Sequence, residues 1–420
     1  MTGRRRGRAG PSAGTRQAGG PLRLLLVAGA RPNFMKIAPL LREFRSHPDR
    51  FDARLVHTGQ HYDEAMSEVF FSELEIPKPD VHLGAGSGSH AAQTARIMEA
   101  FERVLENEHP DWVVVVGDVN STLACSVVAA KMSPPVPVAH VEAGLRSGDR
   151  TMPEEINRIV TDALSDLLFT TSPDAGANLR REGVEPRRIH HVGNVMIDTL
   201  RRFAARSDGS DILPRLGIEP PYAVLTLHRP SNVDDHAALG RIVAALQEIA
   251  RDLPIVFPAH PRTIKMMEAF GVRVGGAPGH GPSGLRMMEP LGYLDFVHLE
   301  KRAALVLTDS GGVQEETTIL GVPCLTLREN TERPVTVTRG TNRLVGSDTT
   351  RIVREARRLL RGRKKGPPTI SLWDGRAASR IAAVFAELPV PSRPRPPQVP
   401  GSAGLPRGSR GRRVRMRTER

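Results

Sequence analysis

The chain has 420 residues and a formal net charge of +13, from 59 lysines and arginines against 46 aspartates and glutamates. Hydrophobic residues make up 39% and charged residues 25%, the composition of an ordinary soluble protein that is long enough for two or three domains. Only 4% of the residues are aromatic, which excludes a surface built for stacking nucleic-acid bases.

The excess positive charge lies at the two ends of the chain. Residues 1–20 carry five arginines and no acid, and residues 388–420 carry nine arginines and one glutamate. These ends account for the whole net charge, so residues 21–387 are formally neutral. Both ends are rich in Gly, Pro, Ser and Arg and are predicted to be disordered basic tails. Only these tails would support contact with nucleic acid, so a nucleic-acid partner is not expected.

No secretory or membrane segment is recognisable. The first twenty residues lack the apolar stretch of a signal peptide, and neither arginine-rich end flanks an apolar run of about 18 residues. The two cysteines, Cys125 and Cys324, lie in apolar contexts without the short spacing of a zinc site. A cytoplasmic protein with reduced thiols and no membrane partner is therefore expected.

Short apolar runs alternate with helical patterns through the first half. A strand is predicted over Leu22–Ala28, followed by a helix over Pro32–His47 with its proline in the first turn. The run Trp112–Val116 (WVVVV) is typical of a strand covered on both faces. The other predicted elements of this half are strands over Arg54–His57, Val136–Val141 and Leu167–Thr170, and helices over Ser121–Met132 and Glu154–Ser165.

A second cycle begins after the turn-rich segment Arg206–Pro221. Its predicted strands are Tyr222–Leu227, Ile255–Pro258, Ala303–Thr308 and Cys324–Leu327, and its predicted helices are Asp234–Arg251, one from about Gly312, Thr349–Arg361 and Leu372–Glu387. Strand–helix alternation implies parallel sheets with right-handed crossovers. The prediction is an α/β protein with two Rossmann-like, doubly wound parallel-sheet domains that face one another across a central cleft. The expected domains are 21–192 with the returning helix 371–387, and 193–370 as the nucleotide-binding domain.

Ligands of doubly wound sheets bind where the carboxyl ends of strands meet helix N-termini. Arg31 and Lys36 flank such an N-terminus after the first strand, a place that favours anions, although solvated surface positions are the alternative. The segment Gly29–Lys36 has neither Walker spacing nor a full GxGxxG, so an ATP or NAD motif is not supported.

Three carboxylates occupy comparable positions in the first half. Asp118 follows WVVVV, Glu142 follows the strand ending at Val141, and Glu154 opens a helix. Helix capping, an ion pair with Arg146 and complementation of the helix dipole are the respective structural alternatives. Convergence of all three on one strand-end edge favours a catalytic role.

The second half contributes a candidate pyrophosphate loop. In TDSGGVQEE a strand ends at Ser310-Gly311-Gly312 and a helix begins, so bare backbone amides and a hydroxyl are offered to an anion. Glu316 lies one turn into that helix and would accept from sugar hydroxyls, and Arg333 follows the next strand. Plain packing of the glycine pair is the alternative.

Two histidines, His228 and His260, also follow predicted strands, and each is either structural or part of the site. Together these residues predict a cleft for a phosphorylated, hydroxyl-rich ligand with acids and a histidine beside it. No cluster of metal ligands or nicotinamide fingerprint accompanies them, so neither a metal nor a cofactor is expected.

These motifs resemble those of the non-hydrolysing UDP-N-acetylglucosamine (UDP-GlcNAc) 2-epimerase family, whose two-domain fold is similar to that of B-type glycosyltransferases. The matching strings run in family order from Leu22 to about Gly346: GARPNFMK, HTGQHYDEAMSEVFF, VVVVGDVNST, HVEAGLRS, MPEEINR, LTLHRP, PAHPRT, TDSGGVQEE and ENTERPVTVTRGTNRLVG. The resemblance implies catalytic roles for Asp118, Glu142, Glu154 and His228, and substrate-binding roles for Arg31, Lys36, Ser310, Gly311, Gly312, Glu316 and Arg333, to which the strand-end position of His260 adds a further substrate-binding candidate.

Two departures from the family pattern stand out. Ala30 and Asn33 replace the usual threonine and glutamate, and Gln60-His61-Tyr62-Asp63-Glu64 stands where many bacterial members have QHREM. The latter segment serves an allosteric UDP-GlcNAc site in those members, so allosteric activation is not expected here.

The resemblance also implies a reaction, in which UDP is eliminated to a 2-acetamidoglucal and re-added to give the N-acetylmannosamine epimer (UDP-ManNAc). A homodimer and a place in the biosynthesis of cell-surface polysaccharides are further implications. Three enzymatic alternatives remain open: a hydrolysing 2-epimerase, an epimerase of a modified UDP-2-acetamido sugar, and a glycosyltransferase that uses a UDP-sugar.

Overall fold

A computed structural model describes residues 20–60, 64–272, 284–362 and 366–389. The tails predicted over 1–20 and 388–420 therefore lie outside the described residues, except at their inner edges. Most of the glycine-rich connection Gly271–Gly284 lies outside them too.

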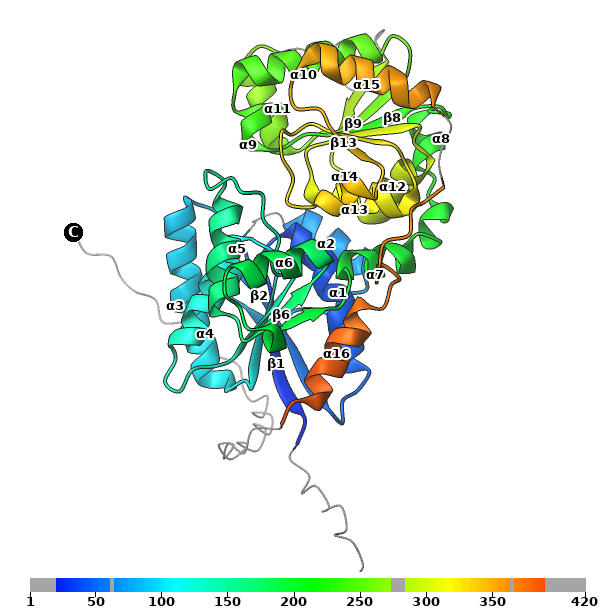
Figure 1. Ribbon diagram of the computed structural model, residues 1–420. Coiled ribbons are helices and arrows are strands. Elements are labelled where there is room, and N and C mark those ends of the chain that lie inside the picture. Colours follow the sequence, from blue (N-terminus) through cyan, green and yellow to red (C-terminus); the bar gives the residue numbers. More distant parts are fainter. Residues whose placement is uncertain (1–19, 61–63, 273–283, 363–365, 390–420) are drawn as a thin grey trace, which may run out of the picture. The chain divides into compact units, whose positions relative to one another are not determined.

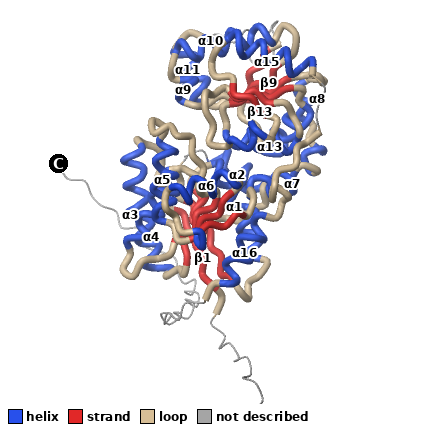
Figure 2. Tube along the Cα trace, viewed as in Figure 1, coloured by secondary structure: helices blue, strands red, loops and turns tan. Residues whose placement is uncertain are grey.

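The first half forms a sheet of seven parallel strands in the order β3-β2-β1-β4-β5-β6-β7. Figure 2 shows this sheet in red among the helices of the first half. Its strands are β1 (Leu22–Ala28), β2 (Phe51–His57), β3 (Val81–His82), β4 (Trp112–Val116), β5 (Val138–Val141), β6 (Leu167–Thr170) and β7 (Ile189–His191). Residues 113–116 of β4 are all buried, as predicted for a strand covered on both faces.

Helices cover both faces of this sheet, because the side chains of β1 alternate between two cores. Leu24 and Leu26 pack in the core that holds α1 and α16, whereas Leu25 and Val27 pack in the core that holds α3 and α4. Figure 1 shows α1 and α16 on one side of the sheet and α3 and α4 on the other. The helices of this half are α1 (Arg31–Arg45), α2 (Glu64–Glu73), α3 (His90–Glu108), α4 (Asn120–Lys131), α5 (Pro153–Leu164), α6 (Pro173–Arg181) and α7 (Val195–Phe203), joined by α16 (Ala377–Glu387). The packing of α16 beside β1 supports the proposed assignment of 371–387 to the first domain.

The second half forms a sheet of six parallel strands in the order β10-β9-β8-β11-β12-β13. Its strands are β8 (Ala223–Thr226), β9 (Ile255–Pro258), β10 (Leu285–Met288), β11 (Leu305–Thr308), β12 (Cys324–Thr326) and β13 (Asn342–Leu344). Its helices are α8 (Ile212–Leu216), α9 (Pro230–Val233), α10 (His236–Ile249), α11 (Pro261–Ala269), α12 (Tyr293–Arg302), α13 (Gly311–Leu320), α14 (Pro334–Thr338) and α15 (Thr349–Arg361). Leu225 of β8 packs with α10 and α15, and Val224 packs with α12.

Two parallel-sheet α/β domains are thus confirmed. The elements that were not predicted are the strands β3, β7, β10 and β13 and the helices α2, α3, α6, α7, α8, α9, α11, α12 and α14. Helix α3 was not predicted, although a buried stripe from Gln93 through Ile97 to Phe101 repeats at helical spacing. The last helix begins at Ala377 rather than at Leu372, because Leu372 and Gly375 have φ values of 61° and 85° and form a turn. Among the described residues, no helix is long and apolar enough to cross a membrane.

Candidate active site

Two of the predicted catalytic carboxylates lie on adjacent loops at one edge of the first sheet. Asp118 follows β4 and Glu142 follows β5, and these strands are paired in register with Val116 opposite Val141. The backbone of Glu142 is left-handed, with φ at 75°, which costs a residue with a Cβ about 1–3 kcal/mol. Strain of this kind at a buried acid supports a functional role for it.

The carboxylate of Glu142 is buried and held by one oxygen only. Its Oε1 accepts from Lys36 Nζ at 2.7 Å and from Arg333 Nη2 at 3.0 Å. Its Oε2 has no hydrogen-bond partner among the described residues. Arg146, the ion-pair partner offered by the sequence, pairs instead with Asp162 and Glu182. Glu142 is therefore anchored at one oxygen and unengaged at the other, as an acid that exchanges a proton with a ligand needs to be.

Arg333 is buried among three carboxylates. It donates to Glu142, to Glu315 (Nε to Oε1, 2.8 Å) and to Glu332. Arg333 and Arg328 hold the pKa of Glu332 well below its ordinary value, although burial alone would raise it. Burial, together with the charge of Glu142, raises the pKa of Glu315 to about 7 in spite of Arg333. The guanidinium of Arg333 thus donates hydrogen bonds to carboxylates in this structure. Its contact with a diphosphate stays a prediction.

Asp118 pairs with an arginine that the sequence analysis did not select. Arg158 of α5 donates from Nη1 to Asp118 Oδ2 at 2.7 Å and also contacts Glu155 at 3.0 Å. Burial alone would raise the pKa of Asp118, but the charges of Arg158 and Lys36 outweigh it and lower this pKa. Asp118 is therefore poised as a carboxylate that accepts a proton.

The two glutamates at the start of α5 have different surroundings. Glu155 is buried and accepts from the backbone amides of Ser147 and Gly148. Glu154 is 37% exposed and lies 3.8 Å from Arg229 Nη1. Glu155 thus holds a loop, whereas Glu154 remains the accessible acid that the sequence predicted.

His228 is oriented by a buried aspartate, Asp309, at the end of β11. The His228 Nδ1 lies 3.0 Å from Asp309 Oδ1, and Asp309 also accepts from the backbone amides of His228 and Arg229. Burial would raise the pKa of Asp309, but His228 and these amides lower it to about 2. Asp309 therefore holds the imidazole by Nδ1, and the His228 side chain is 40% exposed. Asp309 lies within the TDSGG string, and its position directly after a strand was the signal that could have selected it.

His260 lies near His228, with 6.2 Å between the ring centroids. It caps the N-terminus of α11, and its Nδ1 accepts from the backbone amide of Arg262 at 3.2 Å. The structure thus brings the two predicted histidines together and gives His260 a capping role as well.

The candidate pyrophosphate loop forms the start of α13. Ser310 is the N-cap residue and its side chain makes no capping hydrogen bond. A Cβ at Gly311 would collide with Arg333 and Glu332, so glycine is required there, whereas one at Gly312 would meet only Met196 Cε. The free amides of this helix end lie beside the buried charges of Arg333 and are available to an anion.

The remaining predicted ligand-binding residues lie on α13 and α1. Glu316 Oε1 accepts from Tyr293 Oη at 3.0 Å, and burial raises the pKa of Glu316 to about 7. Lys36 turns to Glu142, as described above. Arg31 begins α1, but its side chain lies outside the described part of the structure.

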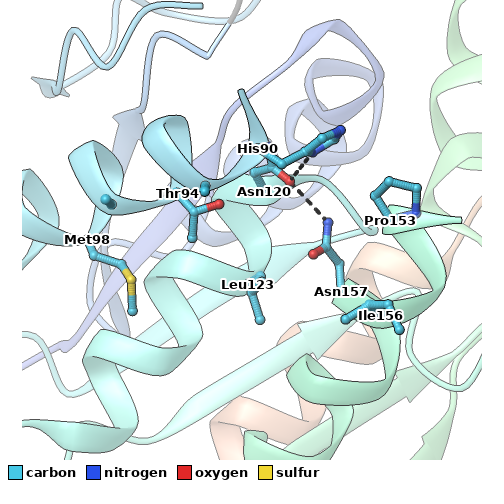
Figure 3. A pocket seen from close by; sticks show the side chains of 10 residues that line it. His90, Thr94, Met98, Asn120, Leu123, Pro153, Ile156 and Asn157 are labelled. Carbon is cyan, nitrogen blue, oxygen red and sulfur yellow. Dashed lines mark hydrogen bonds between the residues drawn. The ribbon is translucent and has the colours of Figure 1, made fainter. Parts of the chain in front are cut away.

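A pocket of about 460 Å³ lies beside α3, α4 and α5. Figure 3 shows His90, Asn120 and Asn157 at its polar side, where Asn120 Oδ1 contacts both of the others. Asn157 also donates to the backbone carbonyl of Asp118 at 2.8 Å. None of the predicted site residues lines this pocket, but it adjoins the Asp118 loop and the start of α5, where Pro153 directly precedes Glu154.

Glu300 of α12 is fully buried, and neither of its carboxyl oxygens has a hydrogen-bond partner among the described residues. Burial and then the charge of Glu316 raise the pKa of Glu300 well above its ordinary value. Replacing Glu300 with methionine is expected to raise the free energy of unfolding at pH 8 by about 1–3 kcal/mol, because an unsatisfied polar group is removed.

This gain has a defined pH dependence. A carboxyl group whose folded pKa is raised contributes stability that falls as the pH rises above its ordinary pKa. The gain from Glu300→Met, measured by urea unfolding, is therefore expected to be larger at pH 8 than at pH 6. Glu102→Met, at an exposed position of α3, is the control and is expected to show no such trend. A gain that shrinks as the pH rises would contradict this account of Glu300.

The sequence and the structure were compared with known proteins. A family model described as UDP-N-acetylglucosamine 2-epimerase matches residues 42–386. The UDP-N-acetylglucosamine 2-epimerase of Methanocaldococcus jannaschii is 42% identical over 372 residues, which cover 87% of this chain and 99% of that protein. The UDP-2,3-diacetamido-2,3-dideoxy-D-glucuronate 2-epimerase of Pseudomonas aeruginosa is also 42% identical, over 87% of this chain and 100% of that protein. A crystal structure of the M. jannaschii enzyme in complex with UDP-GlcNAc and UDP matches with a TM-score of 0.79 and 40% identity, over 87% of this chain and 99% of that one.

Proposed function

The chain belongs to the UDP-N-acetylglucosamine 2-epimerase family, and from this membership we propose that it interconverts UDP-GlcNAc and UDP-ManNAc without net hydrolysis. The observation that carries the proposal is the pair of carboxylates on adjacent strand-end loops, Asp118 ionised beside Arg158 and Glu142 with one oxygen unengaged.

The chemistry follows from the weak acidity of the sugar C2 proton. As the C1–oxygen bond to UDP breaks, positive charge grows at C1 and C2 becomes acidic enough for a carboxylate to remove its proton. The electron pair of the C2–H bond then forms the double bond of 2-acetamidoglucal, and UDP leaves with the C1–O pair. Protonation of C2 from the opposite face and return of UDP to C1 give the epimer.

The roles that we propose in these steps are those predicted for the residues from the sequence. We assign the proton transfers to Asp118, Glu142 and Glu154, assisted by His228. The amides at the start of α13 and Ser310 would hold the departing diphosphate, and Arg31, Lys36 and Arg333 would supply positive charge. Glu316 would accept from the ribose, and His260 would border the ligand.

The proposal is tested by incubating the protein with UDP-GlcNAc in deuterium oxide. The expected result is an equilibrium mixture with UDP-ManNAc, in which deuterium appears at C2 of both recovered UDP-sugars. Stoichiometric free ManNAc and UDP would point to the hydrolysing reaction instead. Without deuterium at C2 the elimination chemistry is wrong, and transfer to an added acceptor would then indicate a glycosyltransferase.

A second candidate substrate is UDP-2,3-diacetamido-2,3-dideoxy-D-glucuronate, because the P. aeruginosa relative that is named for it shares 42% identity with this chain. That sugar carries an added carboxylate and a second acetamido group, but the atoms that react at C1 and C2 are of the same kind. Measurement of kcat/KM for UDP-GlcNAc and for the diacetamido glucuronate decides between them, because the true substrate is expected to have the larger value.

We also propose that the chain forms a homodimer in the cytoplasm. Apolar side chains along the α3–α5 pocket, among them Met98, Leu123 and Ile156, support a face for self-association. Both cysteines are buried free thiols, which supports a reducing compartment.

A further inference from the structure

A buried histidine, His140 of β5, has acceptors at both of its ring nitrogens. Nδ1 lies 2.6 Å from Asp162 Oδ1, and Nε2 lies 2.8 Å from the backbone carbonyl of Gly117. The oxygens of an ionised carboxylate and of a carbonyl have no hydrogen to donate, so both partners can only accept from the ring. The two contacts therefore hold the ring between the carboxylate of Asp162 and the backbone that precedes Asp118.

Asp162 holds a second loop with its other oxygen. Oδ2 accepts from the backbone amide of Gly144 at 3.0 Å and from Arg146 Nη1 at 2.7 Å. Gly144 and Arg146 belong to the loop that begins with Glu142, whereas Gly117 directly precedes Asp118. The His140–Asp162 pair thus contacts both the loop that carries Asp118 and the loop that carries Glu142. Both side chains of the pair are buried.

The backbone of these loops is unusual and needs such support. Gly117, Glu142 and Gly144 have φ values of 66°, 75° and 80°. A residue with a Cβ keeps a left-handed backbone conformation only where the surrounding contacts hold it there. The contacts of Asp162 and His140 supply part of that constraint.

We propose that His140 and Asp162 are positioning residues, which hold the carboxylates of Asp118 and Glu142 at the separation that the epimerisation requires. This inference rests on the proposed function. Both side chains are buried, so we expect the pair to act through the geometry of the two loops.

Two variants separate the two contacts of the histidine. An asparagine amide reaches the place of Nδ1, so His140→Asn keeps the contact with Asp162 and loses the one with Gly117. A glutamine amide reaches the place of Nε2, so His140→Gln keeps the contact with Gly117 and loses the one with Asp162. Each is expected to lower kcat by about a hundredfold, because displacements of about 1 Å cost that much, while KM and the affinity for UDP change less than threefold.

The control is Val138→Ala, at a fully buried position of the same strand. It is expected to lower the midpoint of thermal unfolding and to keep kcat for the folded enzyme. If the histidine variants lose no more kcat than Val138→Ala does, the pair is merely structural and the proposal fails.

A second measurement does not depend on the folding of any variant. In ¹⁵N spectra of the wild-type protein labelled at its histidine rings, at least one ring N–H of His140 is expected to exchange slowly with solvent, because both ring nitrogens face buried acceptors. Assignment is by cross-relaxation to neighbouring residues of β5. Rapid exchange of that hydrogen would overturn the proposal. Failure of the wild-type protein to exchange deuterium at C2 would instead refute the proposed function and leave this spectrum unchanged, so the two failures are distinguishable.

Discussion

Replacing Glu142 with glutamine is expected to lower kcat for epimerisation by about 10²–10⁴-fold, the usual contribution of a positioned acid or base, while UDP still binds. Glutamine keeps the size of the side chain and an oxygen that accepts from Lys36 and Arg333. It loses the unengaged oxygen that would exchange a proton with the sugar. Asp118→Asn is expected to act in the same way, because its amide cannot accept the C2 proton.

Steady-state kinetics give kcat, and calorimetry gives the affinity for UDP. Glu106→Gln, at an exposed position of α3, is the control and should retain full turnover. If both Glu142→Gln and Asp118→Asn kept wild-type kcat, the assignment of proton transfer to these carboxylates would have to be abandoned.

Replacing Arg333 with methionine is expected to lower the free energy of unfolding by about 3–5 kcal/mol, because it leaves buried carboxylates without their partner. Glu142, Glu315 and Glu332 all lose a hydrogen bond from the guanidinium. Arg343→Met is the matched control, since Arg343 also pairs with a glutamate but is 42% exposed. Its cost is expected to stay below about 1 kcal/mol.

The cost of Arg333→Met should depend on pH. The pKa of Glu315 is already raised to about 7 beside Arg333, and removal of the positive charge raises it further. A carboxyl group with a raised folded pKa contributes stability that falls as the pH rises through that pKa, so the deficit is expected to be larger at pH 8 than at pH 6. Urea unfolding at the two pH values measures it. An equal deficit at both would show that the buried carboxylates are not its source.

Much of the fold was predictable because its signals are local. The apolar run of β4, the alternation of strands and helices and the polar residues after each strand are all visible in short windows of sequence. Helix α3 was missed although its buried stripe has the same kind of signal. The turn at Leu372 and Gly375, which delays α16, depends on two left-handed residues, one of them not glycine, and has no such local signature.

The residues of the candidate site also divide into those that local sequence signals predicted and those that they did not. Asp118, Glu142, His228 and the start of α13 were selected from strand-end positions, and Glu154 was selected from the start of a helix. Each lies at the end of the element where it was expected. Arg158, Asp309 and Asp162 were not selected, because each acts through a partner from another element. The prediction that Arg146 pairs with Glu142 was wrong, because the folded chain brings Arg146 to Asp162 of another element instead.

The sequence by itself determined that the net charge of +13 belongs to the two ends, that the body alternates strand and helix, and which loops carry acids, histidines and glycines. Only the tertiary structure decided which charged side chains form ion pairs with one another. Lys36 and Glu142 are 106 residues apart in the chain, and Glu142 and Arg333 are 191 apart. Even so, Lys36 and Arg333 both donate to the same buried oxygen, Oε1 of Glu142. Ionic and hydrogen-bond energies depend on distance and burial, and these are properties of the folded chain that no local pattern contains.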